Sequence, residues 1–235
     1  MSMNRSPRTG IIGAMDEEIK LLLEGMQEKE TTIKAGITYY TGTVFGQPVV
    51  LCKSGVGKVN AAVTTQILID SFGVTQVLFT GVAGALHPEL NIGDIVISSR
   101  CMQHDMDATA LGFPRGTIPY QEVSSFPADP ELILQAEKAC RELKQTYLTG
   151  IVLSGDQFIA SSDRVTLLRE QLEGSCAEME GAAVAQVCYM NNIPYLVIRS
   201  MSDKADGSAH VNFAEFTVAA SERSHAILER ILQGS

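Results

Sequence analysis

The sequence predicts an α/β fold built on a largely parallel sheet. Short apolar runs of strand length alternate with segments whose apolar residues recur at the helical period, which is typical of strand–helix–strand units. With 235 residues, of which 45% are apolar, the chain is long enough to bury the core of one large domain. We find no internal repeat or linker in it. We therefore expect one domain over residues 9–235, preceded by a flexible polar tail at residues 1–8.

The first half of the chain is predicted to place two helices between short strands. An apolar run leads into the acidic triplet Asp16-Glu17-Glu18, which starts a helix, and two further runs flank a hairpin turn at Phe45-Gly46-Gln47. A glycine-containing turn then opens a long helix in which Val59, Val63 and Ile67 share one face. The expected ranges are strands at 11–15, 37–44, 48–53, 76–80 and 94–99, and helices at 16–26 and 58–72.

The second half begins with a long connection and then returns to alternating elements. Residues 102–128 contain Pro and Gly without periodicity, and loops of this length in compact domains are usually functional or lie at an interface. Residues 177–180 are expected to be extended and to lead into a helix. The other expected ranges are strands at 149–154 and 195–201, and helices at 130–143, 163–172 and from about 213 to 232.

Composition and charge argue against several classes of protein. The formal net charge is −9 and no basic cluster is present, so the chain lacks the Lys and Arg footprint that nucleic-acid binding requires. No apolar run approaches the ~20 residues that cross a bilayer, and the N-terminus does not read as a signal peptide. The five cysteines form no CxxC pair. We expect a cytoplasmic protein with no nucleic-acid or membrane partner.

Acidic side chains recur where predicted strands end. Glu178 and Glu180 lie one residue apart, so in an extended segment they would point to one side and Met179 to the other. Strand ends of an α/β sheet converge on one crevice where ligands bind, and we therefore expect Glu18, Glu180 and Asp203 to share a pocket. The competing interpretation is that each carboxylate only caps a helix, where the helix dipole favours an anion by about 0.3–1 kcal/mol.

Other motifs that suggest a cofactor are weak. The turn at 54–59 lacks the first glycine of a P-loop and has Val59 where Ser or Thr would bind magnesium, and the turn at 81–84 lacks the spacing of a dinucleotide fingerprint. The segment 104–107 has one His and two Asp, with no second His nearby, so we expect no metal. Arg199 lies inside an apolar strand and would need a nearby carboxylate as its partner.

Five stretches, spread in order over nearly the whole chain from Thr9 onward, carry a resemblance. They are 10–18 (GIIGAMDEE), 53–62 (KSGVGKVNAA), 154–159 (SGDQFI), 177–180 (AEME) and 199–203 (RSMSD). Together they resemble the 5′-methylthioadenosine/S-adenosylhomocysteine nucleosidases of the purine nucleoside phosphorylase superfamily. The resemblance implies a single-domain three-layer α/β/α sandwich with a central twisted mixed β-sheet. It also implies a homodimer without a cofactor that serves methionine salvage.

This resemblance implies a catalytic pair. The family hydrolyses the bond between adenine N9 and ribose C1′, so by resemblance Asp203 would protonate adenine at N7 and Glu18 would position and deprotonate the attacking water. The arrangement parallels inverting glycosidases, in which one carboxyl stays protonated and the other ionised. Burial behind an apolar strand would favour protonated Asp203, and the nearby helix N-terminus would favour ionised Glu18.

The resemblance also implies a set of binding residues. Phe158 would stack on adenine, the main chain of Ile159 would read its edge, and Glu180 would hold the ribose hydroxyls. The other implied positions are Glu178 and Ser202 in the site, Met179 beside the sugar, Arg199 near the water, Val82, and Met15, Val56 and Phe213 around the 5′-alkylthio group. The segment from Leu111 to Pro119 would enter the pocket of the partner subunit.

Two departures from the family pattern bear on the substrate and the water. Val82 stands where many members carry a Ser that contacts the nucleophilic water, which weakens the account of how the water is held. The segment with Leu111 and Phe113-Pro114-Arg115 replaces one that is commonly rich in aromatic residues, so the preference at the 5′ end is open.

Three alternatives remain beside hydrolysis of methylthioadenosine and S-adenosylhomocysteine. A purine nucleoside phosphorylase needs a cationic cradle for phosphate, whereas Asp16-Glu17-Glu18 would repel phosphate. A nucleosidase for 6-amino-6-deoxyfutalosine in menaquinone synthesis would share the adenine and ribose contacts. A non-catalytic nucleoside-binding protein would not require both an acid and a base, so the three carboxylates argue against it.

Overall fold

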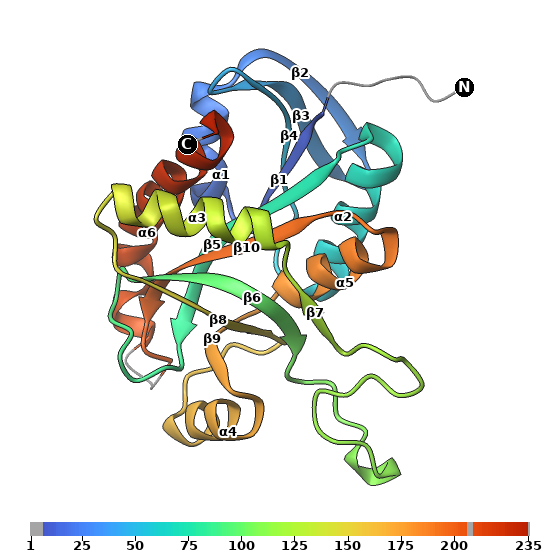
Figure 1. Ribbon diagram of the computed structural model, residues 1–235, viewed down its shortest axis with the longest axis vertical. Helices are drawn as coiled ribbons and strands as arrows, with labels where there is room; N and C mark the ends of the chain where they lie inside the picture. The colour runs from blue at the N-terminus through green and yellow to red at the C-terminus, as the bar shows by residue number, and fades with distance from the viewer. Residues whose placement is uncertain (1–6, 206–208, 235) are drawn as a thin grey trace.

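The ten strands of this chain form a single sheet, which the computed structural model describes for residues 7–205 and 209–234, with side chains described except at 209–215 and 217. Figure 1 shows the ribbon. The strands are β1 Thr9–Gly13, β2 Gln27–Lys34, β3 Ile37–Val44, β4 Gln47–Lys53, β5 Gln76–Ala85, β6 Ile95–Gln103, β7 Ser125–Pro127, β8 Tyr147–Ser154, β9 Gly174–Glu178 and β10 Tyr195–Asp203.

The sheet is mixed and partly closed on itself. Its order is β10-β6-β8-β9-β5-β1-β4-β3-β2, with β7 beside β6, and β5 also pairs with β10. Five of the strand pairings are parallel and five are antiparallel. The expectation of a largely parallel sheet is therefore wrong, because the β2–β4 hairpins and the β5–β9 and β6–β10 pairs add antiparallel partners. The mixed sheet implied by the family resemblance is confirmed.

Helices cover both faces of this sheet. Figure 1 shows α1, α3 and α6 gathered on one side, α2 and α5 on the other, and α4 at one end beside β9. The central strands β5 and β10 are almost wholly buried, as expected for strands covered on both sides, and their first halves are mainly apolar. The helices are α1 Asp16–Gly25, α2 Lys58–Phe72, α3 Pro130–Glu142, α4 Ser162–Leu172, α5 Gly181–Asn191 and α6 Ala209–Gln233, with a 3₁₀ turn, η1, at Thr109–Leu111.

Several elements differ from the sequence-based expectation. The strand β2 was not expected, because every one of its residues is exposed and no apolar alternation marks it. The face of α2 that carries Val59 and Val63 is not the one that packs on the core: Val59 is 75% exposed and Val63 40%, while the buried positions of this helix include Ala61 and Leu68. The helix α6 begins at Ala209 rather than near 213. Residues 1–6 of the expected tail lie outside the described residues.

Candidate active site

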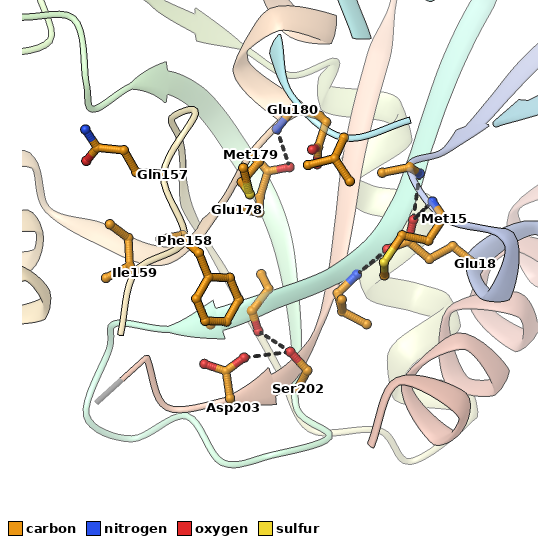
Figure 2. A pocket seen from close by; sticks show the side chains of 16 residues that line it. Met15, Glu18, Gln157, Phe158, Ile159, Glu178, Met179, Glu180, Ser202 and Asp203 are labelled. Atoms are coloured by element: carbon orange, nitrogen blue, oxygen red, sulfur yellow. Dashed lines mark hydrogen bonds between the residues drawn. The ribbon is translucent and has the colours of Figure 1, made fainter. Parts of the chain in front are cut away.

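A cavity of about 310 Å³ opens at the carboxyl ends of several strands. Glu18, Glu180 and Asp203 all line it. The strands β1, β5 and β10 run parallel and side by side, so their carboxyl ends deliver the segments that follow them to one edge of the sheet. The lining, drawn in Figure 2, consists of Ala14, Met15, Glu18, Val56, Val82, Ala83, Gly84, Gln157, Phe158, Ile159, Ala177, Glu178, Met179, Glu180, Ser202 and Asp203.

The structure brings most of the predicted site residues to this cavity and leaves three of the described ones apart from it. Arg199 is 1% exposed and lies buried behind the lining rather than in it. Leu111 and Pro119 belong to the long connection after β6 and are not among the lining residues. The side chain of Phe213 lies outside the described residues.

Glu18 is both a helix cap and a cavity residue. Its Oε2 accepts hydrogen bonds from the backbone N–H groups of Ala14 at 2.6 Å and Met15 at 2.9 Å, and its Oε1 accepts one from Val82 at 3.0 Å. The bond from Met15, the N-cap residue of α1, is that of a capping box. The capping interpretation and the pocket interpretation therefore hold together for this carboxylate.

The pKa of Glu18 is raised, which corrects the expectation that the helix N-terminus would dominate. Burial of the carboxyl raises the pKa, and it outweighs the charge of Arg199 and the three backbone donors, which lower it. A carboxylate with a raised pKa is a stronger base once it is ionised, so this shift suits proton abstraction from water.

Glu178 is saturated by donors from the protein. It accepts hydrogen bonds from the guanidinium of Arg199 and the hydroxyl of Ser154. Both of its oxygens accept the N–H of Gly181 at 2.9 Å, and Oε2 also accepts the N–H of Glu180 at 3.2 Å. With its oxygens occupied by these donors, Glu178 anchors Arg199 and the start of α5.

Arg199 is the buried cation that faces the acidic cluster, as its place in an apolar strand predicted. Burial lowers its pKa, but the charges of Glu178, Glu18 and Glu180 outweigh burial and raise the pKa overall, so the guanidinium stays charged. A side chain at Gly81 would collide with both Arg199 and Glu18. The glycine therefore permits the close approach of this cation to the Glu18 carboxylate.

The segment after β9 bends where an extended chain was expected. The strand ends at Glu178, and Glu180 has φ −138° and ψ −37° as the residue that precedes α5. As a result Met179 lines the cavity together with both glutamates, and the expectation that it points away from them is wrong. Figure 2 shows the three side chains along one wall.

Glu180 is a buried carboxyl whose pKa is also raised. Its Oε1 accepts the N–H of Gly57 at 2.8 Å, and the residue is 5% exposed. Burial, followed by the charge of Glu178, raises the pKa of Glu180 to about 8, although Arg199 lowers it. Near neutral pH this carboxyl is therefore largely protonated.

The variant Glu180→Gln is expected to be more stable than the wild type, and increasingly so as the pH rises towards 8. Because the pKa of Glu180 is about 8 in the fold against an ordinary 4.5, the folded state keeps a proton that the unfolded state loses, and wild-type stability falls across this window. Gln is neutral in both states and can still accept from Gly57. The gain should be on the order of a few kcal/mol at pH 8. Urea unfolding of both proteins at pH 5 to 8.5 tests this, and an equal pH dependence would contradict it.

Asp203 lies at the end of β10 with its carboxyl held from two sides. Its Oδ1 accepts the N–H of Ala205 at 2.7 Å, and its Oδ2 lies 2.8 Å from the hydroxyl of Ser202. That hydroxyl is also 3.4 Å from the carbonyl of Ala83. Ser202 can therefore donate to ionised Asp203, or accept from protonated Asp203 and donate to the carbonyl, so the site accommodates both protonation states.

Figure 2 shows that different kinds of side chain line the two ends of the cavity. Phe158, Ile159 and Asp203 lie at one end, and Met15 and Glu18 lie at the other. Phe158 is half exposed and contributes an aromatic face beside the Asp203 carboxyl. A flat heterocycle against Phe158 would thus meet Asp203 at its edge, while the group attached to it would extend towards Glu18.

Side chains of the kinds that bind metal ions are dispersed over residues 7–205 and 209–234. That part of the chain contains no group of three or more His, Cys, Asp or Glu residues arranged to hold a metal ion. All five cysteines are free and buried. No helix within the same residues has the length and apolar character needed to cross a bilayer.

Comparison with known proteins identifies the family. The sequence profile described as "Phosphorylase superfamily" matches residues 8–233. The chain belongs to the phosphorylase superfamily. This confirms the superfamily that the five sequence stretches indicated.

Relatives within the phosphorylase superfamily are similar along their whole length. The chain is 42% identical over 226 residues to a 5′-methylthioadenosine/S-adenosylhomocysteine nucleosidase of Pseudoalteromonas translucida, covering 95% of this chain and 96% of the relative. The crystal structure of such a nucleosidase from Neisseria meningitidis in complex with methylthio-immucillin-A has 37% identity and a TM-score of 0.93, covering 98% and 100% of the two chains. A futalosine hydrolase of Helicobacter pylori has 34% identity and a TM-score of 0.93, covering 97% and 98%.

Sequence reasoning missed five lining residues of this superfamily member. They are small or lie in a loop: Ala14, Ala83, Gly84, Gln157 and Ala177. Alanine and glycine carry no chemical signal, and they line the cavity because the strand ends on which they sit approach it closely. Gln157 lies within one of the stretches that carried the resemblance, so its position between Asp156 and Phe158 was the available signal.

Proposed function

We propose that this protein hydrolyses the N-glycosidic bond of 5′-methylthioadenosine and S-adenosylhomocysteine, releasing adenine and the 5′-thio-substituted ribose. The observation that carries the proposal is that Glu18 and Asp203 line one cavity from its two ends. Glu180 lines the same cavity. The whole-length similarity to nucleosidases of that name supports the substrate class.

Adenine is a poor leaving group, so the first requirement is a proton donor at the base. Asp203 would donate a proton to N7 of adenine, and Ser202, which lies 2.8 Å from its carboxyl, would hold that carboxyl in place. Phe158 would stack on the base, and the main chain of Ile159 would contact its edge. Proton donation lets the C1′–N9 bond break, with positive charge developing on the ribose.

The second requirement is a water on the opposite face of the sugar. Glu18 would accept the proton of this water as it attacks C1′, and the buried charge of Arg199 would hold the surrounding carboxylates in place. Glu180 would accept hydrogen bonds from the ribose hydroxyls, with Met179 beside the ring. Apolar Met15 and Val56 would contact the 5′-alkylthio group.

Water rather than phosphate is the acceptor that the cavity favours. None of the described residues that line it is Lys or Arg, and the buried charge of Arg199 is already matched by Glu178. A phosphate dianion would therefore meet carboxylates without a cation of its own. The test is adenine release from methylthioadenosine in phosphate-free buffer, which we expect to proceed at full rate. Strict dependence on added phosphate would make the protein a phosphorylase, and nucleoside binding without adenine release would make it a binding protein.

A second substrate, 6-amino-6-deoxyfutalosine, follows from one observation. The solved structures that are similar to this chain include a futalosine hydrolase, with a TM-score of 0.93. The proposed base and ribose contacts would serve either substrate. Measuring kcat/KM for methylthioadenosine, S-adenosylhomocysteine and aminodeoxyfutalosine with one preparation would rank them. A dominant kcat/KM for the last would place the enzyme in menaquinone synthesis instead of methionine salvage.

We also propose a cytoplasmic homodimer in which the segment from Leu111 to Pro119 completes the pocket of the partner subunit. Leu111 is 71% exposed and Tyr120 92%, so this connection presents apolar and aromatic surface to its surroundings. Val56, at the cavity, is 52% exposed and would gain cover from such a segment. Five free buried cysteines suit a reducing compartment.

A further inference from the structure

The start of α2 binds two carboxylates that belong to different parts of the molecule. The N–H of Gly57 donates to Glu180 in the cavity wall, and the N–H of Lys58 donates to Asp156 Oδ1 at 2.8 Å. Asp156 lies in the loop after β8, two residues before Phe158. Gly57 has φ +99°, which favours glycine, and this backbone aims both N–H groups at their acceptors. The start of α2 thus contacts both the cavity wall that carries Glu180 and the loop that carries Phe158.

The side chain of Lys58 ties a third segment into the same arrangement. Its Nζ lies 2.6 Å from Asp105 Oδ1 and 2.9 Å from Gln103 Oε1, both at the end of β6. Asp105 Oδ2 in turn accepts the N–H of Asp156 at 2.9 Å. Lys58, Asp105 and Asp156 therefore close a ring of hydrogen bonds that joins the ends of β6 and β8 to the start of α2.

Within this ring the Lys58–Asp105 pair is sheltered, whereas Asp156 is exposed. The side chains of Lys58 and Asp105 are 17% and 15% exposed, in contrast to the surface pair Lys53–Asp16 at 43% and 78%. Burial alone would raise the pKa of Asp105, but Lys58 and the Asp156 N–H outweigh burial and lower it. A shielded pair with additional hydrogen bonds constrains its neighbours more than an exposed pair does.

We propose that Lys58, Asp105 and Asp156 form a clamp that positions the loop carrying Phe158 against the wall carrying Glu180. None of the three lines the cavity, so they are positioning residues and act through the aromatic face and the ribose carboxylate. The proposal rests on the proposed function, because it assigns Phe158 to the adenine. It predicts that the clamp determines affinity for the base.

The test compares Asp156→Ala with Asp156→Asn. Asn keeps the Oδ1 that accepts from Lys58, and Ala removes it. We expect Asp156→Ala to raise the Kd for free adenine and the KM for methylthioadenosine about tenfold, with a smaller change in kcat, and Asp156→Asn to stay within about twofold of the wild type. Adenine affinity by calorimetry and steady-state kinetics give the two readouts.

Lys58→Met provides a second variant, with Lys53→Met as its matched control. Lys58→Met retains the backbone donor to Asp156 but leaves Asp105 without its cation, so a rise in adenine Kd like that of Asp156→Ala is expected. Lys53→Met breaks only the exposed pair with Asp16 and should leave the adenine Kd unchanged.

The outcomes separate the clamp from the proposed function. If the wild type releases adenine and folded Asp156→Ala and Lys58→Met bind adenine as the wild type does, the clamp is refuted and the function stands. If Asp156→Asn loses as much affinity as Asp156→Ala, the acceptor bond is not the cause and the clamp is refuted. If the wild type neither binds nor releases adenine, both proposals fail.

Discussion

Replacing Asp203 with Asn is expected to lower kcat for adenine release by a factor of about 10²–10⁴, which corresponds to about 3–5 kcal/mol of transition-state stabilisation. Asn is nearly isosteric and keeps an oxygen that accepts from Ala205, so the fold should survive. It carries no proton that adenine N7 can take, and the base must then leave without protonation. We expect KM to change little, because the contacts of Phe158 and Ile159 with the base remain.

A substrate with a better leaving group distinguishes loss of the acid from damage to the site. A 5-thioribosyl compound that releases p-nitrophenolate needs little protonation, so the deficit of Asp203→Asn should shrink strongly with it. The control is Asp70→Asn, which alters an exposed aspartate on α2. Near-normal adenine release by Asp203→Asn, or an equal deficit with both substrates, would remove Asp203 from the proposed role.

Replacing Glu18 with Gln is expected to cost a similar factor of about 10²–10⁴ in kcat. Gln cannot take a proton from water, whatever the leaving group, so the deficit should persist with the p-nitrophenyl substrate. Because burial raises the pKa of Glu18, the wild-type kcat/KM should fall at acidic pH with a midpoint above that of an ordinary glutamate, and this limb should be absent from the residual activity of the variant.

The matched control for this variant lies one residue away. Glu17 is exposed on the same first turn of α1, so Glu17→Gln removes an equal charge near the helix N-terminus without entering the cavity. It should retain wild-type turnover and pH dependence. Equal losses in Glu17→Gln and Glu18→Gln would attribute the effect to helix electrostatics, and wild-type turnover in Glu18→Gln would refute a base at this position.

Local pattern predicted the elements whose burial leaves a periodic signal. The helix α2 was expected over the range in which it is observed, and the strands β3 and β4 were placed to within one residue. The strand β2 was not predicted, because both of its faces are solvated. Its place in the sheet depends on its pairing with β3. The closure of β5 on β10 was also not predicted, since strand pairs distant in sequence leave no local pattern.

The candidate site likewise has features that local pattern predicted and features that depend on the fold. Carboxylates after apolar strands indicated the cavity, because parallel strand ends converge there. The net effect on Glu18 did not follow from the sequence, since it depends on burial by segments remote from α1. The clamp was equally hidden: Lys58 lies 47 residues from Asp105 and 98 from Asp156, and only the fold brings them together.

The central claim is that Asp203 and Glu18 act on one nucleoside from opposite faces of its sugar. The most direct measurement is a reaction of methylthioadenosine in phosphate-free water enriched in oxygen-18, with the sugar product followed by NMR before its anomers equilibrate. Attack by water opposite the departing base predicts that the label enters at C1 and that the first product is the α anomer, the inverted configuration. A first product of β configuration, or no reaction until phosphate is added, would contradict the account.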